Sequence, residues 1–361
     1  MKETGYIAKS AWKAFVEGLV ARYRVYAPCR DGETVAFRRI QGKEEPCLDR
    51  PAAGAPKAAL LPQSETLFGF VLKKDPVDPR KTEVELKAEI EEPPTVILCG
   101  RPCDARGFTI IDPVFLDADP YYRKRREGTT IITLACPTAY EGCFCTSVGG
   151  GPADKAASDV LVTELDQGYY VEPLTDKGRE ALKDAPLEEG APHREEAEER
   201  QRKAFTRVKK AFPGGKDLKV SPERFESDRF WQEASAKCLS CGACTYLCPT
   251  CYCFNITDEQ GVDTGERIRS WDACMFSHFT LEASGHNPRA QKWQRLKQRV
   301  GHKFVYYPEK YGEAACSGCG RCIRLCPVSV EISGIVAALA APEEPHTKEA
   351  GADREEERAT R

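Results

Sequence analysis

The chain has 361 residues, of which 41% are hydrophobic and 30% charged, and its formal net charge is −3. This length allows two domains with cores of their own, whereas the near-neutral charge argues against a general nucleic-acid-binding protein, which would carry a basic excess. No stretch approaches the roughly 18 apolar residues of a membrane-spanning helix, and the N-terminus has no signal-peptide pattern, so we expect a soluble, cytoplasmic protein.

Residues 1–175 predict an α/β domain. Apolar side chains recur at helical spacing over residues 10–23 and predict an amphipathic helix. Short apolar runs bounded by turn residues then predict strands. These strands are expected at 95–99, 129–135, 160–165 and 169–171, the last two joined as a hairpin.

The second half of the chain divides by composition into three parts. Residues 176–230 are charged, and 195–210 has the composition of a solvated linking helix with no sign of chemistry. Cysteine dominates the next part, which we expect to form a domain over 231–341. The tail at 342–361 is charged and lacks aromatic residues, which predicts disorder.

The strongest signal is a pair of cysteine runs with the spacing C-x-x-C-x-x-C-x-x-x-C-P. The first run ends at Cys248-Pro249 and the second at Cys326-Pro327. Both match the bacterial ferredoxin pattern, in which three cysteines of a run hold one [4Fe–4S] cluster and the fourth holds the other. The ligand sets are then Cys238, Cys241, Cys244 and Cys326 for cluster 1, and Cys316, Cys319, Cys322 and Cys248 for cluster 2.

Structural zinc is the competing interpretation of closely spaced cysteines, but a zinc site takes four ligands, usually as two separated pairs. Three evenly spaced cysteines followed by Cys-Pro, twice over, do not fit that arrangement. Between the runs, residues 276–283 and 288–302 carry helical patterns. We therefore predict an α+β protein: an N-terminal α/β domain followed by a C-terminal helical two-cluster ferredoxin domain.

Weaker cysteine signals lie outside the two runs. Five cysteines occur between residues 99 and 145 on turns that follow predicted strands, and four of them could converge on a third [4Fe–4S] cluster. The set is Cys103, Cys136, Cys143 and Cys145, with Cys99 left to the core. The alternative is that they are buried structural cysteines, since a free cysteine packs as a small hydrophobic residue.

A further group of three cysteines has no unique interpretation. Cys251, Cys253 and Cys274 could hold an additional cluster with His278 as fourth ligand, pack beside cluster 1, or take part in thiol chemistry. Cys29 and Cys47 belong to no motif. The chain also shows no dinucleotide-binding or phosphate-binding loop and no nucleophile motif.

Several of these segments resemble a family of proteins from multi-subunit enzymes of anaerobes. The family comprises the beta subunit of sulfhydrogenase-type nickel–iron hydrogenases and the corresponding iron–sulfur subunit of anaerobic sulfite reductase. The resemblance covers nearly the whole chain apart from the linker and the tail. It rests on RPCDARGFTIIDPVF at 101–115, CFCTSVGGGP at 143–152, CLSCGACTYLCPTCYCF at 238–254, RSWDACMFSHFTLEASGHNPR at 269–289 and CSGCGRCIRLCPV at 316–328.

The resemblance implies an iron–sulfur electron-transfer subunit that is not an enzyme on its own. Such a subunit stands between a partner that binds FAD and NAD(P)H and a separate catalytic subunit of hydrogenase, sulfite reductase or heterodisulfide reductase type. The alternative hypothesis is a catalytic iron–sulfur reductase that uses the N-terminal thiols or a flavin of its own. A catalytic chain should turn over substrate alone, whereas a relay should need its partners.

Overall fold

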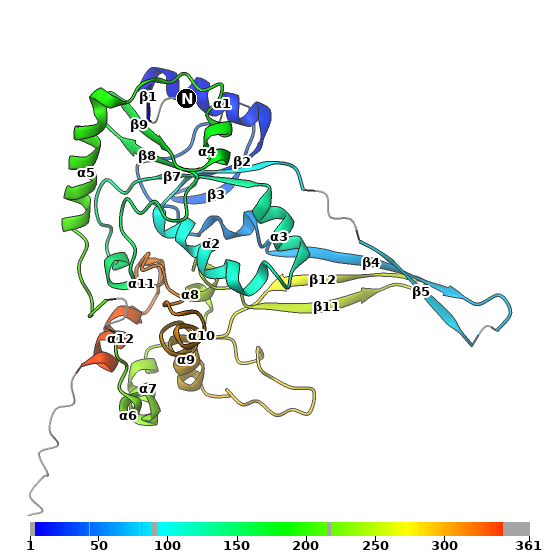
Figure 1. Cartoon of the computed structure of the whole chain (residues 1–361). Helices are drawn as coiled ribbons and strands as arrows, with labels where there is room; N and C mark the ends of the chain where they lie inside the picture. The colour runs from blue at the N-terminus through cyan, green and yellow to red at the C-terminus, as the bar shows by residue number, and fades with distance from the viewer. Residues whose placement is uncertain (1–3, 43, 79, 89–91, 215–217, 342–361) are drawn as a thin grey trace, which may run out of the picture.

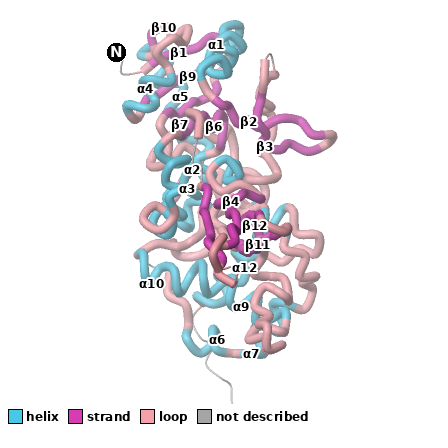
Figure 2. The backbone as a smooth tube through the Cα atoms, turned by 90° about the vertical axis from the view of Figure 1, so that its right-hand side faces the viewer, coloured by secondary structure: helices cyan, strands magenta, loops and turns pink. Residues whose placement is uncertain are grey.

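The computed structural model describes residues 4–42, 44–78, 80–88, 92–214 and 218–341. The predicted disordered tail at 342–361 lies outside these residues. An eight-stranded sheet with its helices forms one end of the molecule, and helices from the second half of the chain form the other (Figure 2). A four-stranded sheet projects sideways from the junction between them (Figure 1).

The eight-stranded sheet has the order β10-β1-β9-β8-β7-β6-β2-β3. Its four central strands β8, β7, β6 and β2 run parallel, and the flanking pairs are antiparallel. The strands are β1 (Gly5–Ala8), β2 (Arg24–Asp31), β3 (Thr34–Ile40), β6 (Thr95–Gly100), β7 (Thr129–Leu134), β8 (Val160–Glu164), β9 (Gly168–Pro173) and β10 (Glu188–Glu189). The two central strands β6 and β7 are buried along their whole length, as expected for parallel strands covered on both faces.

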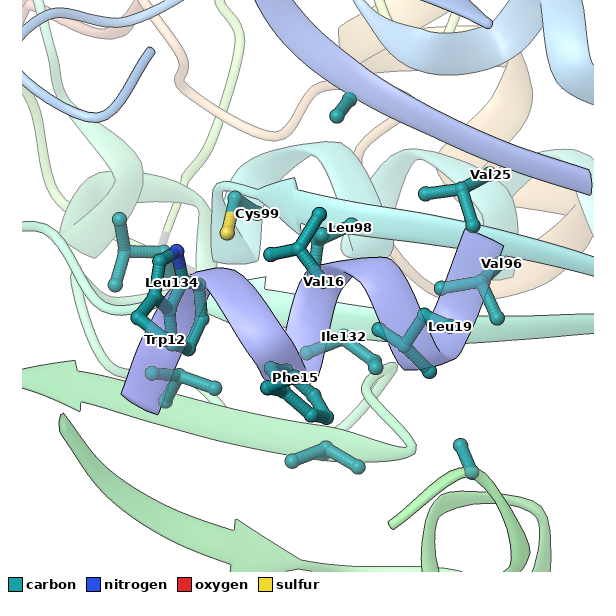
Figure 3. Close-up of a cluster of buried hydrophobic side chains, with 14 of the residues drawn as sticks. Trp12, Phe15, Val16, Leu19, Val25, Val96, Leu98, Cys99, Ile132 and Leu134 are labelled. Atoms are coloured by element: carbon teal, nitrogen blue, oxygen red, sulfur yellow. The ribbon is translucent and has the colours of Figure 1, made fainter. Parts of the chain in front are cut away.

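Helices cover both faces of this sheet. Helix α1 (Lys9–Arg22) packs Trp12, Phe15 and Leu19 against one face (Figure 3). Helix α2 (Pro102–Phe115) and helix α3 (Pro120–Glu127) contribute to a second core on the opposite face. Alternate residues of β6 serve the two cores, because successive strand side chains point to opposite faces. The predicted N-terminal α/β domain is thus confirmed.

Segments after residue 175 also pack on the N-terminal sheet or join it. Helix α4 (Asp176–Ala181) buries Ala181 in the first core, and β10 pairs with β1 at the edge of the sheet. After η3 (Ala191–His193), helix α5 (Arg194–Thr206) buries only Ala197 and Ala204 and leaves its charged side chains outside. The expected solvated helix is therefore present, but it is held against the N-terminal sheet.

The projecting four-stranded sheet was not predicted. It has the order β11-β12-β4-β5 and joins a hairpin from each half of the chain in antiparallel pairing. Its strands are β4 (Ser64–Lys74), β5 (Thr82–Lys87), β11 (Phe254–Gln260) and β12 (Thr264–Trp271). Sequence analysis missed it because β12 is stabilised by β4, almost 200 residues away, rather than by a local pattern.

The helices predicted between the cysteine runs need two corrections. Residues 276–283 form turns, not a helix, and Asn287 stabilises them by donating to the Ser277 carbonyl and accepting from the Thr280 hydroxyl. The second helix begins later than residue 288, because α9 spans Lys292–Gly301. It continues through the π-helical η5 (His302–Tyr306) into α10 (Tyr307–Tyr311).

Short helices complete the C-terminal domain around a third apolar core centred on Trp231. They are α6 (Pro222–Glu226), α7 (Asp228–Ser235), α8 (Ala243–Tyr246), α11 (Arg321–Arg324) and α12 (Ile332–Ala340), with η1 (Pro56–Ala59) and η2 (Cys145–Val148) in the N-terminal half. The C-terminal domain is therefore helical, as predicted. Within the described part of the chain, no helix is long and apolar enough to cross a membrane.

Candidate iron–sulfur site

The first predicted ligand set faces one cavity. Cys238, Cys241, Cys244 and Cys326 all line it, with walls from the apolar side chains of α9, α12 and the Met275 turn. Gly242 begins α8 with φ +73°, and a Cβ there would stand 2.7 Å from the Phe276 ring. Only glycine suits such a position, so the local backbone brings Cys241 and Cys244 to the same cavity.

The second set is also brought together, across the two runs. The thiols of Cys316, Cys319 and Cys322 each interact electrostatically with Cys248 from the first run. Cys248 lies just beyond the single turn of α8, while Cys244 on that turn faces the first cavity. Cys322 lines that same cavity, so the two sets are neighbours.

The third set converges from three places in the N-terminal domain. Cys103 lies in the first turn of α2, Cys136 follows β7, and Cys143 and Cys145 flank the start of η2. Their thiols interact electrostatically with one another. Burial raises the pKa of Cys136 to about 11 and the pKa of Cys145 to about 12, because a buried site disfavours the charged thiolate.

The third set lies directly against the second ferredoxin run. Gly318 has φ +62°, and a Cβ on it would lie 2.5 Å from the Cα atom of Cys145. The Phe144 amide donates to the Gly318 carbonyl at 2.9 Å, and the Cys143 thiol donates to the Cys319 carbonyl at 3.5 Å. The three sets therefore form a row, with the set containing Cys319 in the middle.

Buried cations surround the middle of this row. Lys57, Arg299 and Lys303 are each less than 5% exposed, and none forms an ion pair with a described carboxylate. Lys303 donates to the Cys248 thiol at 3.6 Å, to Thr250 at 2.7 Å and to the Ala315 carbonyl at 2.8 Å. Arg299 donates to the Cys251 thiol at 3.6 Å and to the Cys244 carbonyl at 3.0 Å.

These cations would balance negative charge on sulfur. Burial alone would lower the pKa of Lys303, but its neighbours Cys248 and Cys251 outweigh that effect and raise the pKa. For Lys57, which donates to the carbonyls of Thr245 and Cys251, burial prevails and lowers the pKa. A buried cation is costly without an anionic partner, and bound thiolate clusters would supply that partner. Sequence analysis missed all three cations, because isolated basic residues carry no motif.

A buried ion pair connects the two domains beside the row. The Arg321 guanidinium, in the second run, contacts both carboxylate oxygens of Asp104 at 2.5 and 3.1 Å, and both side chains are almost fully buried. Arg321 also donates to the Ala52 carbonyl at 3.1 Å. The pair fixes the second run against the start of α2, where Cys103 lies.

The remaining cysteines belong to none of the three sets. The thiols of Cys253 and Cys274 are close neighbours, as are those of Cys251 and Cys248. His278 is two-thirds exposed, 3.7 Å from the Asp272 carboxylate. Cys29 and Cys99 are buried in the N-terminal core, as expected for Cys99, and Cys47 lies near its edge.

Two observations bear on whether iron–sulfur clusters fit these sets. Backbone amides donate to three of the predicted ligands: Ser240 to Cys238 at 3.4 Å, Gly318 to Cys316 at 3.4 Å and Val330 to Cys326 at 3.3 Å. Such bonds to sulfur are the usual means of tuning these centres. Among the described residues no three cysteine, histidine or acidic side chains are arranged for a single metal ion; a cubane cluster spaces its ligands more widely.

Comparison with known proteins agrees with this chemistry. Residues 237–330 match the family model of the 4Fe-4S dicluster domain. The chain is 32% identical over 321 residues to the protein named sulfhydrogenase 2 subunit beta of Pyrococcus furiosus, an alignment that covers 85% of this chain and 90% of that protein. No solved structure matches. The identity and coverage show that this iron–sulfur protein belongs to the sulfhydrogenase beta-subunit family.

Proposed function

We propose that the chain is the electron relay of an oxidoreductase complex, between one partner that binds a flavin and NAD(P)H and a separate catalytic subunit. One observation carries the proposal: twelve cysteines fall into three adjacent sets of four. Bound [4Fe–4S] clusters would exchange single electrons. The named relative is a beta subunit, which supports membership of a multi-subunit complex.

The row of sets has two ends at the surface, as a relay requires. Cys241 is exposed at the end formed by the first set. At the other end, Cys136 and Cys143 line pockets open to solvent. The middle set is enclosed by Lys303, Arg321 and the packed glycine loop at Gly318, so electrons would enter and leave only at the ends.

The residues around the row have electrostatic and structural roles rather than catalytic ones. Lys303 donates to Cys248 of the first run and Arg299 to Cys251 just beyond it, so both would stabilise negative charge on sulfur. The amides of Ser240, Gly318 and Val330 also donate to sulfur. Sets of four thiolates leave no open position for a substrate. Nicotinamide delivers two electrons as hydride, so a flavin on a partner must convert them to single electrons.

Iron analysis tests the number of clusters. Three sets predict about 12 iron atoms per chain after anaerobic reconstitution, against about 8 for the ferredoxin runs alone. About 16 would mean that Cys251, Cys253 and Cys274 hold a further cluster. A Cys136→Ser variant should lose about 4 iron atoms, while a Cys29→Ser variant loses none. Stoichiometric zinc with little iron would refute the proposal.

Reduction by different donors tests the relay itself. The isolated chain should be bleached by dithionite but not by NADH or NADPH, and adding a flavin-containing partner should make the nicotinamides effective. Absorbance of the clusters in anaerobic mixtures is the measurement. Rapid bleaching of the isolated chain by NADPH would show a nicotinamide site on this chain and favour the catalytic alternative.

A further inference from the structure

The basic end of α5 lies over the third cysteine set. Residues 200–210, RQRKAFTRVKK, contain six basic residues and no acidic one. Arg207 lines the pocket that contains Cys136 and also the pocket that contains Cys143. Its guanidinium donates to the Thr138 hydroxyl at 3.5 Å, within the loop between these two cysteines. A segment that suggested no chemistry in the sequence therefore borders the end of the relay.

Much of this positive charge is unneutralised. Arg200 pairs with Asp166 and Glu196, and Lys203 pairs with Glu199. No described carboxylate forms an ion pair with the other four basic residues: Arg202, Arg207, Lys209 and Lys210.

Acidic side chains also line these pockets. Glu164, in the pocket of Cys136, is paired with Lys9. Glu141 and Glu331 line the Cys143 pocket. In the pocket of Arg202 and Phe205, Asp154 is paired with Arg106, whereas Glu198 forms no described ion pair. The four unpaired basic residues outnumber Glu198, so the α5 side is net positive on a chain whose net charge is −3.

An apolar side chain lies within the basic segment. The ring of Phe205 is 55% exposed, the backbone of Gly151 lies beneath it, and Arg202 lines the same pocket. Exposed aromatic residues accompanied by arginine are typical of protein interfaces. A small anion would not contact this apolar ring. It is also too small to contact basic groups that are spread along the whole segment.

We propose that the surface formed by Arg202, Phe205, Arg207 and Lys209 docks an acidic electron-transfer protein and passes electrons through the third cysteine set. The inference rests on the proposed function, because it needs a cluster at Cys136 and Cys143. Complementary charge steers such a partner to this end of the row. Electron transfer falls steeply with distance, so a partner held over these pockets has the shortest path to the relay.

The test uses flavodoxin, a small acidic flavoprotein, as the probe and the reconstituted full-length chain as the acceptor. Flavodoxin hydroquinone, which is anionic at neutral pH, loses one electron to become the neutral semiquinone, and one oxidised cluster gains that electron. The second-order rate constant is measured by stopped flow at low and high salt. We expect it to fall as salt rises, because salt screens exposed charges.

Charge reversal supplies the decisive variant. Arg202→Glu/Arg207→Glu/Lys209→Glu should lower the rate constant about tenfold or more at low salt and remove most of its salt dependence. The matched control, Lys74→Glu/Lys81→Glu/Lys87→Glu on the projecting sheet, changes the net charge equally and should retain the rate. Phe205→Ala should weaken the reaction at high salt, where the apolar contact dominates.

Two further readouts separate the possible failures. Iron content and direct reduction by dithionite should be the same in every variant. The docking surface would be overturned if both triple variants lowered the rate constant equally, or if the rate constant did not depend on salt. This holds even with about 12 iron atoms bound. If wild type binds only about 8 and Cys136→Ser changes nothing, the third cluster itself is absent, and the three-cluster relay fails independently of the docking surface.

Discussion

At the scale of single residues, the unusual feature is positive charge buried beside sulfur. Lys57, Arg299 and Lys303 donate to carbonyls, hydroxyls and thiols, Lys57 also lies over the Trp271 ring, and none of them has a described carboxylate partner. A cation lowers the energy of the more negative, reduced state of a cluster and so raises its reduction potential. Each of these residues is therefore expected to affect the potential of the centre that it faces.

Lys303→Met tests this expectation at the middle set. The variant removes the ammonium group 3.6 Å from the Cys248 thiol but keeps a long side chain in the core, so the cluster should assemble and its potential should fall. A redox titration followed by electron paramagnetic resonance gives the potential. Lys310→Met, at an exposed position of α10, is the control. Equal potentials for both variants would contradict the role of Lys303.

At the scale of elements, the single turn of α8 places cysteines of the first run in two different ligand sets. Cys244 on the turn faces the cavity of the first set, while Cys248 beyond it interacts with the three cysteines of the second run. The ferredoxin spacing predicts this crossing. By contrast, the turns at 276–283 escaped prediction, because they depend on the side chain of Asn287 rather than on periodicity.

The crossing predicts how ligand variants should group. Cys248→Ser should perturb the spectrum of the same cluster as Cys319→Ser, and Cys241→Ser should perturb a different one. Electron paramagnetic resonance signals recorded at several stages of reduction distinguish the clusters. If Cys248→Ser and Cys241→Ser alter one common signal, each run holds its own cluster and the assignment is wrong.

At the scale of the whole molecule, the two domains meet around the row of cysteines. The glycine loop of the second run packs on Cys145, and the Arg321–Asp104 pair lies beside this contact. A third contact joins α2 to the first run, because a Cβ on Gly107 would lie 2.7 Å from Pro249. The domains are therefore expected to unfold together rather than independently.

Asp104→Asn should destabilise this junction strongly. It leaves Arg321 charged and buried without its anion, and breaking a buried pair costs about 3–5 kcal/mol. The midpoint of urea unfolding, followed by circular dichroism with the clusters in place, should fall accordingly. Asp258→Asn removes an exposed pair with Arg267 on the projecting sheet and should cost at most about 1 kcal/mol. Similar shifts in the two variants would show that the buried pair does not join the domains.

The sequence by itself determined the ferredoxin chemistry and much of the N-terminal sheet. Cysteine spacing is a local property, so the two runs are visible without a fold, and apolar periodicity predicts α1 and the central strands for the same reason. Only the tertiary structure decided which distant residues meet. It joined two hairpins into the projecting sheet, placed Lys57 from the N-terminal half beside the first run, and brought the basic end of α5 over Cys136 and Cys143. Such meetings depend on chain packing between segments far apart in sequence, which leaves no trace in local residue order.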